Sequence, residues 1–475
     1  MQPSMFNVRV PLEARDEVFL MNTLTDAQLV VSRDVVSLLD RFTGREPGRE
    51  IEWGAFDRAE REAVDLLFDN GFIVADRKAD QRRLDKYFTA VKNDNSELHV
   101  TVLTTLQCNF ACDYCFQGDH GDHNKFAEKM TLETAAKVGD WIEREMDKVH
   151  PERFTLMFFG GEPLLNLPVM YYLAERMWGA SGSRGVPMSI TVITNGLMLT
   201  PEVVDRLAPY GLNGFKITLD GDRDAHNRMR PLRGGQGTFD RIIENIRKVA
   251  GRTKIAIGGN FDESSVDSYP ALLEFLREQE FADKLLNVNF KPVVRTEAAR
   301  PKGVLPLVPV GANGQPLKPL GGTCMTNVGE AGASGCDSCA FLDDKMEFLR
   351  KETKRHGFRT SDGVHNGPCH IHHTHAQTIG PDGSLYACPG FTGEKGLSTG
   401  HIDGRLDASR ESARQNFDRL HPWKECKDCA FIPTCAGGCL VASHTQLGDM
   451  NMPTCHKPSF ESAVISLAHD VSSAA

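Results

Sequence analysis

A regular alternation of apolar, β-rich runs with amphipathic helical stretches occupies residues 97 to 295 and limits the fold more than any other feature of the sequence. Helical stretches such as Leu132 to Val149 and Phe239 to Ala250 lie between the runs. This alternation predicts a parallel sheet with crossover helices. Six runs suit a partial barrel, where chemistry gathers at the strand ends. The runs are Leu98 to Leu106, Phe154 to Phe159, Ser189 to Ile193, Phe215 to Leu219, Lys254 to Ile257 and Leu286 to Phe290.

The bulk composition is that of an ordinary globular protein. The chain has 475 residues, of which 40% are hydrophobic and 25% charged, and this length suggests two to four domains. We find no apolar run of 18 or more residues, and the start MQPSMFNVRVPLEARDE lacks the basic and apolar parts of a signal peptide. We therefore predict a cytoplasmic protein with no membrane partner. The net charge of −10 argues weakly against a nucleic-acid partner, which usually requires a basic face.

The thirteen cysteines are distributed unevenly along the chain. Three lie at positions 108 to 115 and ten lie between positions 324 and 455, while the first 107 residues contain none. In a chain without an export signal, such cysteines are more often metal ligands or catalytic groups than disulfide partners. An odd number also excludes complete pairing. The clustering therefore predicts metal sites.

The first cysteine cluster follows directly from the first β-rich run, in TTLQCNFACDYCFQGD. Cys108, Cys112 and Cys115 have the spacing C-x3-C-x2-C. Three soft thiolates on a tight loop suit iron–sulfur chemistry. A closed four-iron cluster normally takes four cysteines, so a local set of three leaves one iron open to another ligand. The alternative is a zinc loop with a distant fourth ligand.

Short motifs follow the next three strands in order: Gly160-Gly161-Glu162-Pro163, Thr194-Asn195-Gly196 and Thr218-Leu219-Asp220-Gly221. Each motif alone is most often a turn. Their order, the cysteine spacing and Tyr114 before the third cysteine together resemble the radical SAM superfamily, over about residues 97 to 295. SAM is S-adenosylmethionine.

The resemblance implies a chemistry for the first cysteine cluster. In that superfamily, three cysteines hold a [4Fe-4S] cluster whose open iron binds the amino and carboxylate groups of SAM. One electron then breaks a sulfonium C–S bond and releases a 5′-deoxyadenosyl radical, which abstracts hydrogen from a substrate. Cys108, Cys112 and Cys115 are thus the expected catalytic ligands, and a donor of the flavodoxin or ferredoxin type is the expected electron source.

The resemblance also implies which residues bind SAM. Glycines let backbone approach a ligand, and Glu162 can accept a hydrogen bond from an ammonium group. Thr218 and Arg230 are candidates for the SAM carboxylate, because arginine suits planar recognition of carboxylates. Asp220 and His226 are expected to organise SAM rather than to act as a base. The full set of cofactor-binding candidates is Tyr114, Gly160, Gly161, Glu162, Pro163, Thr194, Asn195, Thr218, Asp220 and Arg230.

Seven later cysteines have a long spacing pattern that resembles the SPASM extension of radical SAM enzymes; they are Cys369, Cys388, Cys426, Cys429, Cys435, Cys439 and Cys455. The resemblance implies two auxiliary [4Fe-4S] clusters. The outer one would take Cys426, Cys429, Cys435 and Cys455, and the inner one Cys369, Cys388 and Cys439. Zinc ribbons are the alternative for the C-x2-C pairs.

Three further cysteines fall outside that pattern: Cys324, Cys336 and Cys339. One of them could complete the inner cluster, all three could hold another metal, or they could be redox-active thiols. We favour ligation, because C-x2-C is a good metal clip. Residues 297 to 322 just before them are rich in proline and glycine and predict an irregular insertion.

The first 90 residues contain no cysteine and combine short strands with helices. We expect strands at Phe6 to Val10, Val18 to Asn22 and Leu29 to Val31, then helices at Arg33 to Phe42 and Asp57 to Asn70. The pattern suggests a winged-helix module and resembles the precursor-recognition element of peptide maturases, in which a leader peptide adds a strand to a sheet edge. The alternative is a simple N-terminal cap on the next domain.

The sequence as a whole predicts an α/β protein built around a partial (β/α)6 TIM-like barrel. The expected domains are a winged-helix-like recognition module (1–90), the barrel (97–295), a linker or insertion (296–368) and a loop-rich SPASM domain (369–475). The expected function is oxidative modification of a ribosomally made precursor peptide, such as a thioether or C–C cross-link. The alternatives are a radical enzyme acting on a folded protein, as sulfatase maturases do, or on a small molecule, and a non-enzymatic iron–sulfur carrier, against which the SAM motifs argue.

Overall fold

The computed structural model describes residues 1–12, 15–43, 53–115, 127–293, 337–361, 363–365 and 367–474. The expected irregular insertion at 297 to 322 lies outside the described residues, as do Cys324 and Cys336. Cys339 falls within helix α11 (Asp337–Arg355), but its side chain also lies outside them.

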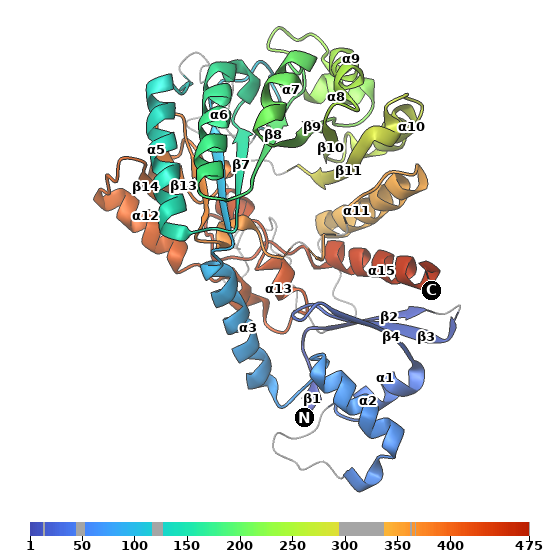
Figure 1. Ribbon diagram of the computed structural model, residues 1–475. Helices are drawn as coiled ribbons and strands as arrows, with labels where there is room; N and C mark the ends of the chain where they lie inside the picture. Colours follow the sequence, from blue (N-terminus) through green and yellow to red (C-terminus); the bar gives the residue numbers. More distant parts are fainter. Residues whose placement is uncertain are drawn as a thin grey trace, which may run out of the picture.

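A nine-stranded sheet with the order β11-β10-β9-β8-β7-β6-β12-β13-β14 forms the centre of the chain (Figure 1). The first six strands of this order are parallel neighbours in chain sequence, which confirms the predicted βα alternation. Their bounds are β6 Glu97–Leu103, β7 Arg153–Phe159, β8 Met188–Thr194, β9 Leu212–Thr218, β10 Lys254–Phe261 and β11 Leu285–Pro292.

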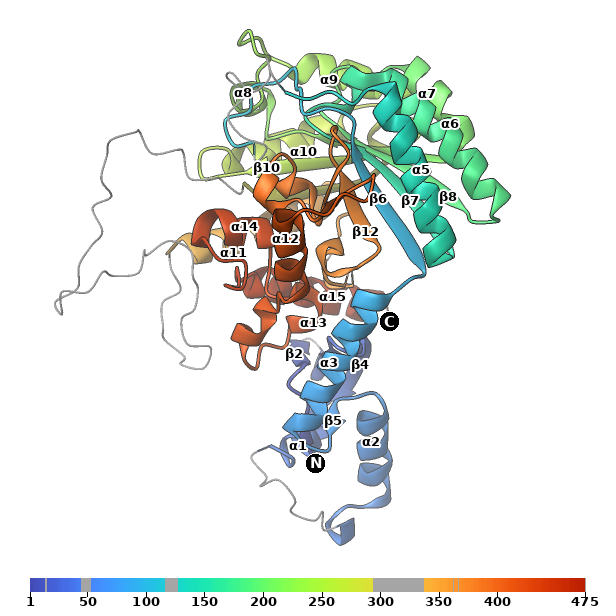
Figure 2. The same ribbon diagram turned by 90° about the vertical axis from the view of Figure 1, so that its left-hand side faces the viewer.

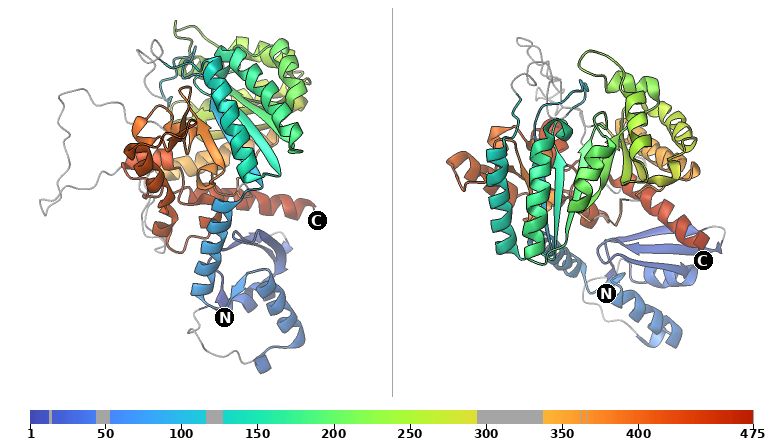
Figure 3. Two further views of the ribbon diagram at one scale, coloured as in Figure 1. Left: turned by 60° about the vertical axis from the view of Figure 1, so that its left-hand side comes forward. Right: turned by 45° about the horizontal axis from the view of Figure 1, so that its top comes forward.

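Crossover helices cover the outer face of these six strands (Figures 1 and 3). They are α5 Leu132–Val149, α6 Leu167–Ser183, α7 Pro201–Leu207, α8 Arg223–Met229, α9 Phe239–Val249 and α10 Tyr269–Arg277. Ile190, Val192 and Ile217 are fully buried under them. Since side chains alternate along a strand, the intervening residues face the inside of the barrel. Those of β7 and β8, such as Thr155 and Ser189, are only half-buried.

The C-terminal segment extends the same sheet, a connection that the sequence did not predict. Strand β12 (Ala376–Ile379) pairs in parallel with β6, opposite His99 to Val102. Strands β13 (Ser384–Tyr386) and β14 (Gly400–His401) follow in antiparallel order. The cysteine-rich segment is therefore joined to the barrel by backbone hydrogen bonds.

Two helices pack between the last parallel strand, β11, and the N-terminal sheet. Helix α11 packs against β11, α10 and the C-terminal helix α15 (Lys457–Ala474). Leu349 of α11 and Phe358 just after it belong to the main hydrophobic core. The backbone continues this contact, because the amide of Val288 donates to the carbonyl of Arg359 at 2.8 Å. Shorter helices complete the C-terminal segment: α12 Ala408–Asp418, α13 Ile432–Cys435 and α14 Leu440–Ala442.

The N-terminal module is a three-stranded antiparallel sheet with helices. Its strands are β2 Asn7–Leu12, β3 Glu17–Asn22 and β4 Ala27–Ser32, in the order β2-β3-β4. Helices α1 (Arg33–Asp40) and α2 (Arg58–Asp69) follow, and a small sheet joins β1 (Gln2–Pro3) to β5 (Ile73–Val74). The expected strands and helices of this module are confirmed to within a few residues.

The N-terminal module packs against the C-terminal segment. Helix α3 (Arg77–Asn93) runs from the module to the barrel (Figure 2), and its Phe88 ring stacks on Trp423 with centroids 3.9 Å apart. On the other side, Val10 and Phe19 of the module share a core with Val464 of α15. The first 90 residues therefore fold against the cysteine-rich segment.

No helix within the described part of the chain is long and apolar enough to cross a membrane.

Candidate functional site

The first cysteine cluster lies on the loop that leaves β6 at its carboxyl end. Burial raises the pKa of Cys108 to about 12, and the charges of Glu162, Cys112 and Cys115 raise it further. Burial raises the pKa of Cys112 to about 11, opposed by the cation of Arg230 and increased by Cys115. The three thiols are therefore close enough to influence one another, as their spacing predicts.

A second strand-end segment, residues 230 to 233, holds this loop in place. The amide of Ala111 donates to the carbonyl of Pro231 at 2.9 Å, and Phe110 forms a β-bridge with Leu232. The Arg233 guanidinium donates from Nε to the Cys108 carbonyl at 3.0 Å. The sequence reasoning missed Arg233, because nothing in its local pattern sets it apart from a surface arginine.

The glycine pair after β7 packs directly on the start of the cysteine loop. A Cβ atom on Gly160 would clash with the carbonyl oxygen of Thr105, and one on Gly161 with that of Gln107. The amide of Gly161 donates to the Thr105 carbonyl at 2.9 Å. Gly160 also has a φ of 142°, which disfavours any side chain. These glycines are therefore required for contact with the cysteine loop itself.

Glu162 joins two strand ends in the buried interior. Its carboxylate accepts hydrogen bonds from the amide of Leu164 at 3.0 Å, the hydroxyl of Thr194 at 2.7 Å and the amide of Asn195 at 2.8 Å. Burial raises its pKa, and these hydrogen bonds oppose that rise. Pro163 begins the short helix η3 (Pro163–Asn166), and its carbonyl accepts from Thr104 at 3.2 Å. The start of the cysteine segment, the Gly160-Gly161-Glu162-Pro163 motif and the Thr194-Asn195-Gly196 motif therefore meet around Glu162 and Pro163.

A hydrogen-bonded network connects the cysteine loop to the end of β9. The Tyr114 hydroxyl donates to the Asp220 carboxylate and accepts from Arg230 Nη1 at 2.6 Å. The amide of Asn260, in β10, donates to Asp220 at 2.6 Å. Thr218 ends β9, two residues before Asp220. Asn260 was missed by sequence reasoning, although it lies at the carboxyl end of the fifth predicted strand, which is the signal that would have found it.

Arg230 has a buried donor that this network does not use. The residue is only 9% exposed, and its guanidinium lies 3.6 Å from Asp220 as an ion pair. Its Nε is buried and has no hydrogen-bond partner among the described residues. A buried donor without a partner is costly and needs an explanation. A carboxylate ligand beside Arg230 would supply the missing acceptor.

Both ring nitrogens of His226 have hydrogen-bond partners inside the fold. Its Nδ1 accepts from the amide of Asp220 at 3.1 Å, and its Nε2 lies 3.0 Å from the Thr238 hydroxyl. Burial lowers its pKa well below the ordinary value, and Arg230 adds to this effect. A neutral imidazole with hydrogen bonds at both nitrogens holds the Asp220 turn in place. Its expected role in organising SAM stays a prediction.

The later cysteines form two groups. Burial raises the pKa of Cys435 to about 12, and the charges of Cys426, Cys455 and Cys429 raise it further. In the other group, burial raises the pKa of Cys388 to about 12, with Cys369 and Cys439 adding to the rise. Within each group the cysteines that act on one another are those that the SPASM resemblance assigns to the outer and inner sets. That these sets hold two clusters stays a prediction.

The turn between Cys435 and Cys439 is unusually sharp. Ala436, Gly437 and Gly438 all have positive φ, at 49°, 86° and 96°. A Cβ on Gly438 would clash with the carbonyl oxygen of Thr454. Such a turn sends two neighbouring cysteines to different groups, because it reverses the chain within three residues.

These thiol groups fit iron–sulfur clusters as ligands. These cysteines are half-buried or exposed. Thiols that raise one another's pKa stay protonated unless a cation lies beside them, and a metal centre provides that cation. Among the described residues, no three His, Cys, Asp or Glu side chains are gathered tightly enough for a single metal ion. A cluster distributes its cysteines over several iron atoms, so wider sets suit it.

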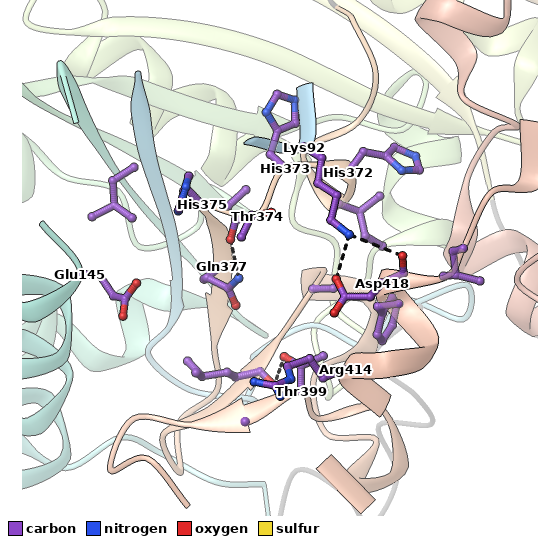
Figure 4. A pocket seen from close by; sticks show the side chains of 18 of the residues that line it. Lys92, Glu145, His372, His373, Thr374, His375, Gln377, Thr399, Arg414 and Asp418 are labelled. Carbon is purple, nitrogen blue, oxygen red and sulfur yellow. Dashed lines mark hydrogen bonds and ion pairs between the residues drawn. The ribbon is translucent and has the colours of Figure 1, made fainter. Parts of the chain in front are cut away.

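A cavity of about 690 Å³ lies away from the cysteine loop, between α3, α5, β12 and α12. His372 and His373 line it, and an ion pair of 3.0 Å joins Lys92 to Asp418 (Figure 4). Burial lowers the pKa of His372 to about 4, with His373 and His421 adding to the effect. Its lining includes none of the predicted SAM-binding residues.

Comparison with known proteins supports the barrel assignment. The family model of the radical SAM superfamily matches residues 102–260. The radical SAM cyclopropyl synthase TigE of Paramaledivibacter caminithermalis is 22% identical over 209 residues, which are 38% of this chain and 43% of TigE. The cysteine-type anaerobic sulfatase-maturating enzyme of Clostridium novyi is 22% identical over 342 residues, which are 70% of this chain and 84% of that enzyme.

A solved structure shares the fold over most of the chain. Native anSMEcpe with bound AdoMet aligns with a TM-score of 0.57 and 17% identity, covering 79% of this chain and 98% of that one. The alignments to the first curated relatives are shorter: they span 43%, 39% and 46% of TigE, a GTP 3′,8-cyclase and an Fe-coproporphyrin III synthase. Together with the strand order and the cysteine loop, these matches identify residues 102–260 as a radical SAM domain, the catalytic domain of an enzyme superfamily.

Proposed function

We propose that this chain reductively cleaves SAM and uses the resulting radical to modify a ribosomally made peptide. The observation that carries the proposal is the gathering of three cysteine sets around one barrel: the set on the β6 loop, and the inner and outer sets of the C-terminal segment. Bound at Cys108, Cys112 and Cys115, a [4Fe-4S] cluster with SAM would supply the 5′-deoxyadenosyl radical.

The residues around the cysteine loop would bind and orient SAM. Arg230 offers its unused Nε to the SAM carboxylate, while Asp220 and Tyr114 fix the guanidinium plane. Glu162 accepts a single described hydrogen bond at Oε2, so that oxygen retains capacity for the SAM ammonium group. Thr194 and Asn195 hold Glu162 in position from the end of β8.

The two later sets would hold auxiliary [4Fe-4S] clusters. Cys426, Cys429, Cys435 and Cys455 form a complete four-thiol set, and Cys369, Cys388 and Cys439 leave one ligand position to another group. Cys324, Cys336 and Cys339 remain candidates for that position. Anaerobically reconstituted protein should contain about 12 iron per chain, corresponding to three four-iron clusters. A count of about four would contradict the auxiliary assignment.

The N-terminal module would bind the leader of the precursor peptide. Strand β4 pairs with β3 on one side, and its other edge has no strand partner among the described residues. Its Val30 side chain is 37% exposed. An unpaired edge with exposed apolar side chains is a template for an added strand. This module, with the barrel and the cysteine-rich segment, would make one peptide-modifying enzyme.

Substitution at the β4 edge tests leader binding at an exposed residue that is not part of the core shared with α15. Val30→Lys should weaken precursor binding about tenfold, because a lysine on an edge strand opposes strand addition. Leu66→Lys is the matched control, since Leu66 is a 53% exposed apolar residue on α2 of the same module. Equal binding by wild type and Val30→Lys would remove the support for leader recognition at β4.

A folded-protein substrate is the second candidate. The alignment with the sulfatase-maturating enzyme of Clostridium novyi covers 70% of this chain, the longest of the sequence alignments described above. Incubation of the reduced enzyme with SAM and either the short peptide encoded beside the gene or a sulfatase separates the two candidates. A mass change on the short peptide alone supports the peptide maturase, and a change on the sulfatase alone supports the second candidate.

A further inference from the structure

Two lysines face the inside of the barrel from strands on either side of β10. On β9, Phe215 and Ile217 are buried against the helices, so Lys216 between them faces inward. On β11, Val288 is buried, so Lys291 also faces inward by alternation. Both lysines remain accessible to water, as the walls of an open barrel would be.

The strand register sets the two lysines diagonally across β10. Lys216 pairs with Ala256, and Lys291 pairs with Asn260 four residues further along the same strand. Gly258 lies between these two positions on the inner face, and its Cβ position is 3.1 Å from Lys216 Cε. The glycine therefore leaves room for the Lys216 side chain to extend along β10 towards the level of Lys291.

The lysine pair carries positive charge without a described counter-ion. Burial lowers the pKa of Lys216, and the charge of Lys291 lowers it further. Within the described part of the chain, neither lysine forms a hydrogen bond or an ion pair. Two like charges that act on each other in a partly desolvated place cost free energy unless an anion joins them. The pair therefore has the chemistry of an anion site.

The lysine pair lies near the residues proposed to bind SAM and near the inner cysteine set. Asn260, the neighbour of Lys291, contacts both Asp220 and Tyr114, at 2.6 Å and 3.3 Å. On the other side, burial raises the pKa of Cys388 and the charge of Lys291 opposes that rise, so Lys291 is also near the inner cysteine set. An anion bound here would lie between the first cysteine cluster and that set.

We propose that Lys216 and Lys291 form a carboxylate-binding site for the substrate peptide, which fixes the residue to be modified inside the barrel. This inference rests on the proposed function and names its substrate class, a peptide with an acidic group at or next to the modified residue. The carboxylate comes from an aspartate or glutamate side chain or from the peptide's C-terminus. The bound carboxylate would lie beside the ammonium groups of Lys216 and Lys291. The barrel therefore discriminates against a peptide in which that carboxylate is replaced by a neutral amide.

Kinetics with the full-length, cluster-loaded enzyme test the site. The probes are the short peptide encoded beside the gene, its single Asp→Asn and Glu→Gln versions, and its C-terminal amide. Lys216→Met and Lys291→Met should each raise KM for the unmodified peptide about tenfold or more. One of the amide versions should cause the same loss, and its effect should nearly vanish in the Lys216→Met enzyme. Lys248→Met, on the outside of α9, is the control and should behave as wild type.

An activity-independent measurement separates this inference from the proposed function. Protein labelled with 13Cε-lysine is titrated with N-acetyl-aspartate methylamide or its asparagine counterpart. The resonance that disappears in Lys216→Met should shift with the aspartate probe only. If it shifts equally with both probes or with neither, or if every amide peptide is modified as well as its parent, the carboxylate site is overturned. If the Lys216 resonance shifts only with the aspartate probe but no peptide is modified, the proposed peptide-modifying function is contradicted and the carboxylate site is still supported.

Discussion

Arg230 donates a 2.6 Å hydrogen bond from Nη1 to the phenolic oxygen of Tyr114, a residue that lies 116 positions earlier in the chain. This contact joins the cysteine loop after β6 to the segment after β9, and Asp220 shares both partners. A spacing motif and a strand-end arginine, separated in sequence, thus become one structural unit. The unit leaves Arg230 Nε buried and without a hydrogen-bond partner among the described residues.

Replacement of Arg230 should weaken SAM binding. Arg230→Lys retains the charge but loses the planar array of donors, so we expect about tenfold or greater loss of SAM affinity. Equilibrium dialysis with labelled SAM and the rate of 5′-deoxyadenosine formation measure the effect. Arg228→Lys, at an exposed position of helix α8 just before Arg230, should bind as wild type. Equal affinity of both variants would contradict the role of Arg230.

The glycine pair after β7 predicts a selective defect in the first cysteine site. Gly161→Ala should destabilise the protein by about 1–3 kcal/mol, because its Cβ would clash with backbone that cannot move without shifting the cysteine loop. Iron content should fall by about four per chain. Gly179→Ala in α6 is the matched control: its Cβ meets open space, so it should raise helix stability by up to about 1 kcal/mol. Unchanged iron content in Gly161→Ala would contradict the account.

How much of this site could be predicted from sequence depends on how local each signal is. The βα alternation is a local pattern, and it predicted the six parallel strands correctly. The cysteine spacings are local patterns too, and the iron–sulfur clusters that they indicate stay predictions. Lys216, Asn260 and Arg233 were missed, because their importance arises only when neighbouring strands and loops meet. The pairing of β12 with β6 was missed for the same reason: a four-residue strand in a loop-rich segment has no periodicity of its own.

Glu97 at the start of β6 makes stability depend on pH. The His99 imidazole, whose Nδ1 lies 3.6 Å from the Glu97 carboxylate, lowers the pKa of that carboxylate to about 2 against burial, together with Thr155 and Arg153. Because the folded pKa is below the unfolded value near 4.5, this contribution is present above pH 4.5 and is lost as the pH falls towards 2. We expect Glu97→Gln to cost about 2 kcal/mol at pH 7, less than half of that at pH 3 and little at pH 2. Thermal unfolding of both proteins across this range tests the prediction; a constant difference would refute it.

The stacking of Phe88 on Trp423 couples the N-terminal module to the outer cysteine set. Both rings belong to the same core as the thiols of Cys426 and Cys429. Phe88→Ala should reduce the free energy of unfolding by about 3 kcal/mol and should speed iron loss from the outer set. Phe68→Ala, a 45% exposed position on α2, controls for loss of a phenyl ring. If both variants retain iron equally, the two parts of the chain are not coupled through this contact.

The central claim is that the enzyme cleaves SAM and modifies a peptide. Its most direct test is mass analysis of the short peptide encoded beside the gene, after anaerobic incubation with the reduced, cluster-loaded enzyme and SAM. The account predicts one 5′-deoxyadenosine for each modification and a peptide lighter by about 2 Da for each cross-link or oxidation. Both changes should be absent with Cys112→Ala. Formation of 5′-deoxyadenosine with the peptide's mass unchanged would contradict the peptide maturase, and its absence under all conditions would contradict SAM cleavage itself.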